Sequence, residues 1–385
     1  MDEKNQGKVH YVCFYCEPEV EGKIDSYPSV ITKIDYIAQT VKATGKEVHL
    51  VSIAPSTKGC FSGCQKTVDA QEKHIYLPSV MCSSRVLGKL CFVINQLLIL
   101  CYLLKTVKKE DSLLVYHSLY NRIWLNLYSR IARRDIILQI EDVFSELTPE
   151  NKRFQTMEWN LLQRMKKCIC VNDLVYQSLQ HVPQKIVSYG SYLLPQNYDI
   201  PPHEGIRLVY AGVIEQERKA AFLSVEAMEF LPPQYELHVL GFGSAEDLAA
   251  LEAKIEAVNA KLGRQAVSYH GRLSGAQYWQ FLQGCDLALS THAYTEDSLA
   301  SANHTFPSKV LTYLANGLGV VAQKLNVLAS SSVSDFFTFY ENPNPVEIAR
   351  AILDAPMVGR EVPRKKIEDL DRRFVQQMEE LLDHA

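Results

Sequence analysis

Residues 305–322 read Thr-Phe-Pro-Ser-Lys-Val-Leu-Thr-Tyr-Leu-Ala-Asn-Gly-Leu-Gly-Val-Val-Ala. This pattern predicts a helix that begins at Pro307, because proline is favoured in the first helical turn, and ends at Gly317, which tolerates positive φ. The apolar run that follows predicts a buried strand of the parallel type. Free N–H groups and the dipole at a helix start attract anions. Ser308 and Lys309 add a hydroxyl and a cation there, so the segment predicts a phosphate or diphosphate site.

Four other segments precede this one, and each contains glycines or basic residues. They read Leu-Val-Tyr-Ala-Gly (208–212), Arg-Lys (218–219), His-Val-Leu-Gly-Phe-Gly (238–243) and His-Gly-Arg-Leu (270–273). Each motif is weak alone, but their order and spacing resemble the nucleotide-sugar glycosyltransferases of the GT-B class, family 4 in particular. The resemblance covers about the second half of the chain. It implies that these segments line the pocket for the sugar donor.

The resemblance also implies the roles of individual residues. Breaking a glycosyl–phosphate bond develops charge on the leaving diphosphate, and the preorganised cations Arg218 and Lys219 would stabilise it. Arg272 takes the family's place for recognition of a uracil base. The alternatives are a surface charge pair, a tight loop at the glycines and a surface arginine. The donor-binding residues implied are Gly212, Gly241, Gly243, Arg272, Phe306, Ser308, Lys309 and Thr312.

One position departs from the family, whose members place two glutamates eight positions apart. His304 and Thr312 stand at these positions. In the family the second glutamate bonds the donor ribose, whereas Thr312 offers a single hydroxyl. We therefore expect ribose recognition to be weaker, or to be assisted by Glu296 or Asp297.

In the first half of the chain, polar residues follow two expected strands. His117 comes after strand 113–116, at the carboxyl end where open α/β sheets bind ligands. The resemblance implies a catalytic histidine that faces the sugar, and a core or loop histidine is the alternative. Glu141 and Asp142 follow the next strand, and adjacent residues of an extended chain point opposite ways, so only one can face the cleft. We assign Glu141 to acceptor binding.

Strand and helix patterns alternate along the chain, as in doubly wound sheets, and the proline-containing stretch 193–205 predicts a linker. The expected fold is α/β, with two tandem Rossmann-like domains (GT-B) and an interdomain cleft. The acceptor-binding domain is expected at 1–195, completed by a crossover helix at 362–385, and the donor-binding domain at 206–358. Strands are expected at 9–15, 48–52, 113–116, 136–140, 168–171, 185–187, 207–210, 238–240 and 320–322, helices at 29–44, 86–107 and 364–384, and a polar loop at 54–73.

The composition is typical of a soluble protein of two domains, with 385 residues of which 47% are hydrophobic and 22% charged. The net charge of −4 provides no general attraction to nucleic acid, so no nucleic-acid partner is expected. The polar N-terminus lacks the apolar core of a signal peptide. The ten scattered cysteines indicate a reducing compartment, and we expect a cytoplasmic location.

Two patterns raise the question of a metal site. Cys13 and Cys16 form a Cys-x-x-Cys, with Cys60 and Cys64 farther on, but a second pair with metal spacing is missing, and core packing is the alternative. The Asp-x-Asp at 369–371 lies on a charged helix, whereas a metal dyad belongs at a strand end. We expect no metal and no cofactor, with the nucleotide sugar as a substrate.

The helix expected at 86–107 is very apolar. Its length and its Asn95–Gln96 pair fall short of an apolar membrane span of about 20 residues. Burial in the first domain is the first expectation. The alternative is a helix lying on the inner face of a membrane, with lysines and arginines near its ends, which would suit a lipid-linked acceptor.

The resemblance implies a hexosyltransferase that uses a nucleotide-diphosphate sugar, with UDP favoured, and a glycan or lipid-linked glycan acceptor of polysaccharide biosynthesis. Retention is expected, because the leaving phosphate can deprotonate the acceptor in a front-face mechanism that needs no nucleophile–base pair. Two alternatives stay open. One is a non-catalytic nucleotide-sugar-binding or regulatory subunit. The other is a sugar-nucleotide epimerase, which needs an acid–base carboxylate in its pocket.

Overall fold

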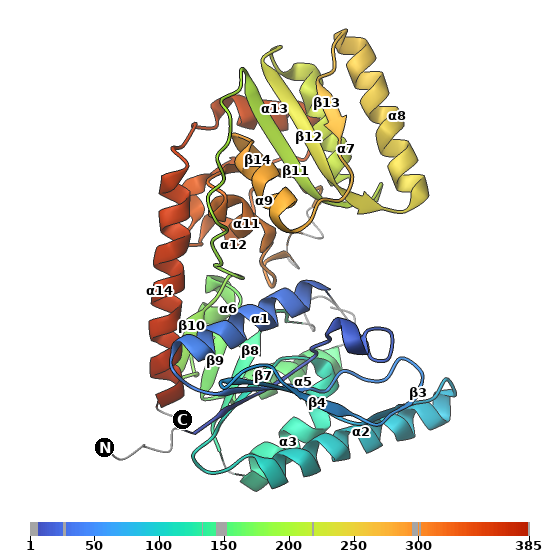
Figure 1. The fold of residues 1–385 in the computed structure, drawn as a ribbon, viewed down its shortest axis with the longest axis vertical. Helices are drawn as coiled ribbons and strands as arrows, with labels where there is room; N and C mark the ends of the chain where they lie inside the picture. The colour runs from blue at the N-terminus through green and yellow to red at the C-terminus, as the bar shows by residue number, and fades with distance from the viewer. Residues whose placement is uncertain are drawn as a thin grey trace. The chain divides into compact units, whose positions relative to one another are not determined.

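The structure of the protein, a computed structural model, divides into two compact units (Figure 1). The first comprises Met1–Ser191 with Arg372–Ala385, and the second comprises Tyr192–Asp371. Each unit is built around its own mainly parallel β-sheet. The residues that the structure describes are 7–25, 28–132, 134–143, 152–217, 219–294, 299 and 302–383.

The first unit contains an eight-stranded sheet in the order β10-β9-β8-β7-β1-β2-β5-β4. Its neighbouring strands are parallel except for β4 and β5. Strands β1, β2, β7 and β8 are buried at every position, as their apolar sequences predict. The strands are β1 (Val9–Cys13), β2 (Val48–Ser52), β4 (Cys64–Thr67), β5 (Glu72–Tyr76), β7 (Ser112–Tyr116), β8 (Ile136–Ile140), β9 (Lys167–Cys170) and β10 (Gln184–Val187).

Residues 54–73 are not the polar loop that we expected. They contain β4, the start of β5, and β3 (Gly59–Phe61), which pairs with β6 (Ser79–Met81) in a separate two-stranded sheet. All four residues of β4 are exposed. The prediction failed because an edge strand is held by backbone hydrogen bonds to its neighbour, and these require no apolar side chain.

Helices cover both faces of the first sheet (Figure 1). Helix α1 lies on one face and α2 and α3 lie on the other. The helices of this unit are α1 (Pro28–Ala43), α2 (Arg85–Thr106), α3 (Arg122–Ala132), α5 (Lys152–Leu162) and α6 (Asp173–Ser178).

Helix α2 is not buried as we expected. It is 22 residues long and is the one helix, among the described residues, that is long and apolar enough to cross a membrane, yet only 28% of its most apolar window is buried. Its buried positions include the polar Asn95 and Gln96, and most of its leucines face outward. The expectation followed from apolar content alone, which does not say which side of a helix packs on the sheet.

The second unit contains a six-stranded parallel sheet in the order β13-β12-β11-β14-β15-β16. In sequence order this is 3-2-1-4-5-6, the arrangement of a Rossmann fold. In the first unit, β5-β2-β1-β7-β8-β9 repeats the same arrangement. The expected fold class, α/β with two tandem Rossmann-like domains, is therefore confirmed. The strands are β11 (Ile206–Ile214), β12 (Tyr235–Gly243), β13 (Val267–Tyr269), β14 (Leu287–Ser290), β15 (Gly319–Gln323) and β16 (Phe337–Tyr340).

The helices of the second unit form two layers. Helices α7, α8 and α13 pack together over an apolar core, and α9 and α11 lie across the sheet from them (Figure 1). Residues 189–205, which include the expected linker, contain no regular element. The helices are α7 (Ala220–Ala227), α8 (Ala245–Leu262), α9 (Gly275–Gln283), α11 (Lys309–Ala315), α12 (Asn326–Ala329) and α13 (Pro345–Asp354).

The last helix, α14 (Glu361–Asp383), begins in the second unit and ends in the first. Its apolar stripe is buried, as the spacing of three and four predicts. In the first unit, the Phe374 ring stacks on Tyr36 with centroids 5.8 Å apart. The buried Lys167 Nζ donates to the Leu381 carbonyl at 2.7 Å, which satisfies one of the free carbonyls at the helix end.

Candidate functional site

The candidate site in the second unit begins where β11 and β12 extend past the neighbouring strands of the sheet. Gly212 pairs with Gly241 and Ile214 pairs with Gly243 in this extension. A Cβ on Gly241 would lie 1.9 Å from the Gly212 carbonyl oxygen, and one on Gly243 would lie 2.3 Å from that of Ile214. Gly241 also has φ +153°, which disfavours other residues. Only glycine allows these strand ends to approach so closely.

A pocket of about 150 Å³ lies at these strand ends. It unites four residues that the sequence assigned to donor binding, contributed by β11, β12, the loop after β13 and the start of α11. This is the place where parallel α/β sheets bind ligands, outside the carboxyl ends of the strands. The pocket is lined by Ala211, Gly212, Leu240, Gly241, Phe242, Arg272, Leu273, Tyr278 and Lys309.

The charged groups of this pocket are cations. Lys309 reaches over Gly212, since a Cβ there would lie 3.0 Å from the Lys309 Nζ. The Arg272 guanidinium lies 5.2 Å from the centre of the Phe242 ring, a cation–π contact. No carboxylate is among the described residues that line the pocket. Its electrostatic character therefore favours an anion.

Helix α11 begins two residues later than we expected, at Lys309 rather than at Pro307. It ends as predicted, since Gly317 follows it with φ +85°. The buried Tyr313 side chain holds the pocket wall, because its hydroxyl accepts from Ala211 N at 3.0 Å and donates to Ala211 O at 3.1 Å. The helix thus positions both Lys309 and the end of β11.

The other predicted donor residues do not line this pocket. Phe306 is buried, Ser308 is exposed and makes no side-chain capping bond, and Thr312 is half-buried one turn after Lys309. Lys219 is exposed in the left-handed region with φ 54°, directly before α7. Arg218, Glu296 and Asp297 lie outside the described residues.

Two aromatic residues of the pocket were missed in the sequence. Phe242 is 51% exposed, although aromatic side chains usually pack inward. Its place between two strand-ending glycines was the available signal. Tyr278 comes from the first turns of α9, and burial raises the pKa of its hydroxyl to about 12. Nothing in the local sequence distinguishes Tyr278 from an ordinary helical tyrosine.

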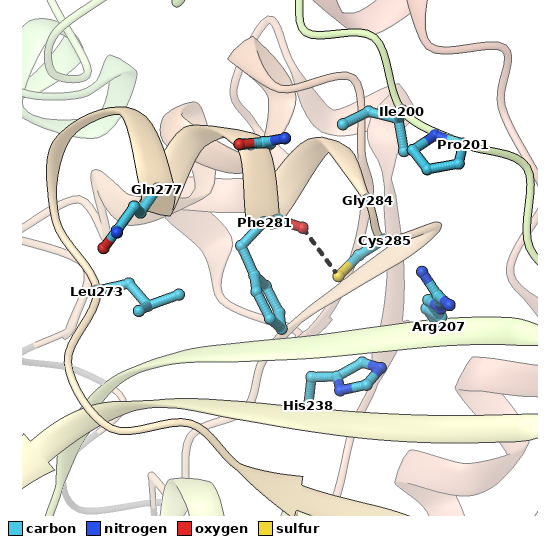
Figure 2. A pocket seen from close by; sticks show the side chains of 10 residues that line it. Ile200, Pro201, Arg207, His238, Leu273, Gln277, Phe281, Gly284 and Cys285 are labelled. Atoms are coloured by element: carbon cyan, nitrogen blue, oxygen red, sulfur yellow. Dashed lines mark hydrogen bonds between the residues drawn. The ribbon is translucent and has the colours of Figure 1, made fainter.

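A larger pocket of about 470 Å³ lies between α9 and the sheet of the same unit (Figure 2). Arg207 and His238 rise from β11 and β12, and the Phe281 side chain points toward them from α9. Burial, His270 at 3.0 Å and Arg207 together lower the pKa of His238 to about 4. This pocket shares Leu273 with the smaller one but none of the predicted donor residues. We therefore place the candidate donor site in the smaller pocket.

In the first unit, a pocket of about 370 Å³ lies at the carboxyl ends of β1, β7 and β8. Strands β1 and β7 are where the strand order reverses, the usual binding position in such sheets. Its lining combines aromatic rings with carboxylates, which suits a sugar-like ligand. The lining residues are Phe14, Asp25, Val30, Pro55, Tyr116, Ser118, Tyr120 and Asp142.

Asp142 lines this pocket and Glu141 does not, while the assignment of Glu141 to acceptor binding stays a prediction. Glu141 lies 3.4 Å from the buried Lys33 amine and accepts a hydrogen bond from Gln139 at 2.7 Å. Burial, with the neighbouring Glu141, raises the pKa of Asp142 to about 6. This pKa lies closer to neutral pH than that of an ordinary aspartate, which is what general acid–base catalysis favours.

His117 is 1% exposed and does not line the pocket. Its Nε2 lies 2.6 Å from a carboxylate oxygen of Glu158, which is also buried. The position at the end of β7 is as predicted, but the imidazole is engaged inside the protein rather than facing a ligand. The pair lies beside Asp142, since the His117 charge lowers and the Glu158 charge raises the pKa of that carboxyl.

The cysteines and the Asp-x-Asp pattern form no metal site among the described residues, where no group of three or more His, Cys, Asp or Glu side chains could hold a metal ion. Cys13 and Cys16 are buried, whereas Cys60 and Cys64 are exposed on β3 and β4. All ten cysteines are free.

The two Rossmann-like units of this chain together define the GT-B fold. Three solved structures with this fold match nearly the whole chain. Trehalose-6-phosphate synthase of Burkholderia multivorans is 9% identical with a TM-score of 0.64, covering 98% of both chains. An Escherichia coli trehalose-6-phosphate protein bound with UDP-2-fluoro glucose is 11% identical, TM-score 0.64, covering 98% of this chain and 97% of that one. Anabaena Alr3699/HepE in complex with UDP and glucose is 14% identical, TM-score 0.60, covering 98% and 100%.

These identities are too low to show more than a shared fold. In comparisons of sequence, neither a protein-family model nor a curated protein matches this chain.

Proposed function

We propose that this protein is a glycosyltransferase that moves a hexose from UDP-sugar to a glycan or lipid-linked glycan acceptor. The observation that carries the proposal is the pocket in which Gly212, Gly241, Arg272 and Lys309 converge with no carboxylate among its described lining. Such a pocket suits a nucleoside diphosphate. Two similar folds have been solved with a UDP compound bound, which supports UDP as the nucleotide.

Each side chain of the pocket has a chemical task in this proposal. Lys309 neutralises the diphosphate as it leaves. Arg218 and Lys219, which follow β11 in the sequence, have the same task. Arg272 and the exposed Phe242 ring sandwich or flank the base. Outside the pocket lining, Ser308 would supply a hydroxyl for the diphosphate and Thr312 one for the ribose. The missing side chains at Gly212 and Gly241 let the phosphates approach this backbone closely.

The first unit would bind the acceptor in the pocket that contains Asp142. A carboxyl group with a pKa near 6 both accepts hydrogen bonds from sugar hydroxyls and exchanges protons. His117 and Glu158 would act through Asp142, because the charge of the first lowers and the charge of the second raises the pKa of its carboxyl group. We retain Glu141 as a second acceptor group, since its carboxylate is 16% exposed. Transfer without a metal ion is proposed because cations can take over the charge-stabilising role of a metal. Transfer with retention is proposed because the leaving phosphate can deprotonate the acceptor in a front-face mechanism.

Specific observations favour each alternative function. Thr312 at the family's ribose-glutamate position favours a non-catalytic nucleotide-sugar-binding subunit. Asp142 favours an epimerase, which needs an acid–base carboxylate. A transferase releases free UDP only when an acceptor is present, an epimerase converts the UDP-sugar without release, and a binding subunit does neither.

Calorimetry with UDP, GDP and ADP on the full chain tests the donor site. We expect UDP to bind most tightly, and the absence of binding to all three would reject the donor site. UDP release is then followed with UDP-glucose and a panel of glycans and lipid-linked glycans. Turnover should persist in the presence of a metal chelator, and complete loss would reject metal-independent transfer. The free cysteines support a reducing, cytoplasmic location for this reaction.

A further inference from the structure

The outward side of α2 is fixed by its two buried polar residues. Asn95 accepts a hydrogen bond from Val80 N at 2.9 Å and donates to Val80 O at 3.0 Å. Gln96 is completely buried and accepts from Trp124 N on α3 at 3.3 Å. Rotating α2 so that its leucines face the sheet would break these hydrogen bonds and leave polar groups inside the unit without partners. The helix is therefore held with its polar pair inward.

The opposite side of α2 is a continuous apolar face. Val86 is 76% exposed and Leu90 is 56% exposed, although leucine and valine are among the residues most often buried. Each member has another member three or four positions away, so they share one side of the helix. The face consists of Val86, Leu87, Leu90, Val93, Ile94, Leu97, Leu98, Cys101 and Leu104.

Helix α3 packs beside α2 on the same face of the sheet and extends this surface (Figure 1). It exposes Leu127 and Ile131, the latter by 57%. We call the α2 face together with these two residues the α2–α3 surface. Apolar patches of this extent are uncommon on monomers and mark interaction surfaces.

The charged residues within α2 and α3 are all basic, and acidic residues appear only beyond the helix ends, at Glu110, Asp111 and Asp135. Neither helix contains an aspartate or glutamate. Basic residues lie in both helices, and two more lysines follow α2. An anionic surface would be attracted to such an arrangement. The basic residues are Arg85, Lys89, Lys105, Lys108, Lys109, Arg122 and Arg130.

The composition distinguishes a lipid surface from a protein partner. Protein interfaces are enriched in aromatic residues and depleted of lysine. The α2–α3 surface has the opposite character, with leucine, isoleucine and valine outward and lysines at its border, while Phe92 and Tyr102 of α2 are half-buried. Interfacial helices that lie in a membrane surface have such an apolar side bordered by cations.

Helix α2 cannot cross the membrane without dismantling the unit. Its length of 22 residues would suffice, but Asn95, Gln96 and Ile99 are buried in the fold, and the strand that follows, β7, pairs with β1 and β8 inside the sheet. The helix must therefore lie along a membrane surface rather than span it.

We infer that the α2–α3 surface docks the protein on a bilayer that contains anionic lipids, with the apolar face entering the headgroup–acyl boundary and the lysines and arginines contacting anionic headgroups. Use of this surface to reach a lipid-linked acceptor rests on the proposed glycosyl transfer, but docking itself does not. The two are therefore tested separately.

The experiment is flotation of the full chain with vesicles of phosphatidylcholine alone or mixed equally with phosphatidylglycerol. We expect binding to the mixed vesicles, weakened by salt, and little binding to phosphatidylcholine. Leu97→Glu should weaken binding by about tenfold or more. It removes a leucine that would enter the bilayer, and it adds a negative charge that the anionic lipids repel. Lys89→Gln should weaken it about fivefold.

Leu353→Glu is the matched control, because Leu353 is also 47% exposed but lies on α13 in the other unit. It should bind vesicles like the unchanged protein. The thermal unfolding midpoint of every variant shows whether the fold is intact. A failure of UDP binding in all variants would count against the proposed function and not against docking.

Three results would overturn the inference. The first is no flotation of the unchanged protein with mixed vesicles. The second is equal flotation of Leu97→Glu and the unchanged protein. The third is a protein that is dimeric in solution, becomes monomeric on Leu97→Glu and does not float, which would assign the surface to a second copy of the chain.

Discussion

The carbonyl oxygen of Gly212 lies only 1.9 Å from the position that a Cβ on Gly241 would take. The ends of β11 and β12 therefore approach each other more closely than any side chain permits. This approach lets both strands run past their neighbours and form a wall of the candidate donor pocket.

Gly241→Ala is expected to damage the fold and the pocket together. The new methyl group must displace the Gly212 backbone, at a cost of about 2 kcal/mol or more, and positive φ adds strain. We expect the thermal midpoint to fall by several degrees and UDP affinity to fall with it. Gly359→Ala is the control, since a Cβ there meets nothing within 4 Å. Equal stability of the two variants would contradict the packing argument.

Lys309→Gln is expected to weaken UDP binding without destabilising the protein. A hydrogen bond to a charged group contributes about 1.5–3 kcal/mol, so the dissociation constant should rise about tenfold to a hundredfold in calorimetry. Lys261→Gln is the matched control, because Lys261 is an exposed lysine of the same unit paired with Glu229 on the surface. An unchanged dissociation constant for Lys309→Gln would remove Lys309 from the donor site.

Arg218→Ala and Lys219→Ala are expected to act on the chemical step. If either cation stabilises the leaving diphosphate, its removal should lower kcat by about 10²–10³. Initial rates at saturating UDP-sugar measure this effect. Lys254→Ala, which removes a lysine paired with Glu226 in the same unit, is the control. Unchanged turnover in both variants would exclude them from catalysis.

Much of the fold and of the donor pocket could be predicted because the signals are local. A glycine at a strand end or directly after a helix indicates the backbone geometry at its own position. Gly241 and Gly317 were identified in this way. The alternation of apolar strands and helices predicted two Rossmann-like units for the same reason. Lys309 was predicted from its place at a helix start, and Arg272 from the resemblance to a known family.

The side-chain directions that the sequence did not reveal depend on distant partners. Glu141 turns away from the pocket toward Lys33, which is 108 positions earlier in the chain, and this leaves Asp142 to face it. The rotation of α2 depends on Val80 and Trp124, which its own sequence does not reveal. Composition indicated that α2 is apolar, but only these contacts show which side is left exposed.

Asp142→Asn is expected to stabilise the protein at neutral pH. Because the folded-state pKa of Asp142 is about 6 instead of 3.8, the folded state binds its proton more tightly, and stability falls as pH rises from about 4 to 6. The penalty is on the order of 3 kcal/mol above pH 6 and absent below pH 4. The variant should therefore unfold at higher urea than the unchanged protein at pH 7.5 but not at pH 3.5.

Glu17→Gln provides a control of opposite sign. Burial by itself would raise the pKa of Glu17, but hydrogen bonds from His74, Lys66 and Tyr76 lower this pKa to about 2. Its charged form stabilises the fold above pH 4.5, and this contribution is lost as pH falls toward 2. Loss of stability in Asp142→Asn at pH 7.5 would contradict the burial argument.

We expect Thr312 to contact the ribose of the proposed donor. It lies half-buried one turn after Lys309 in α11, at the position where the resembled family has a glutamate. A single hydroxyl contributes about 0.5–1.5 kcal/mol as a neutral hydrogen bond, so Thr312→Val should weaken UDP binding about threefold to tenfold in calorimetry. Thr312→Glu should strengthen it, because a carboxylate accepts from two ribose hydroxyls at once. The deoxy nucleotide dUDP, which lacks the ribose 2′-hydroxyl, is the control and should bind Thr312→Val and the unchanged protein alike if the threonine contact is to that hydroxyl. An affinity unchanged by valine and abolished by glutamate would mean that Thr312 only packs within the helix, and the ribose would then have to be read by residues outside α11.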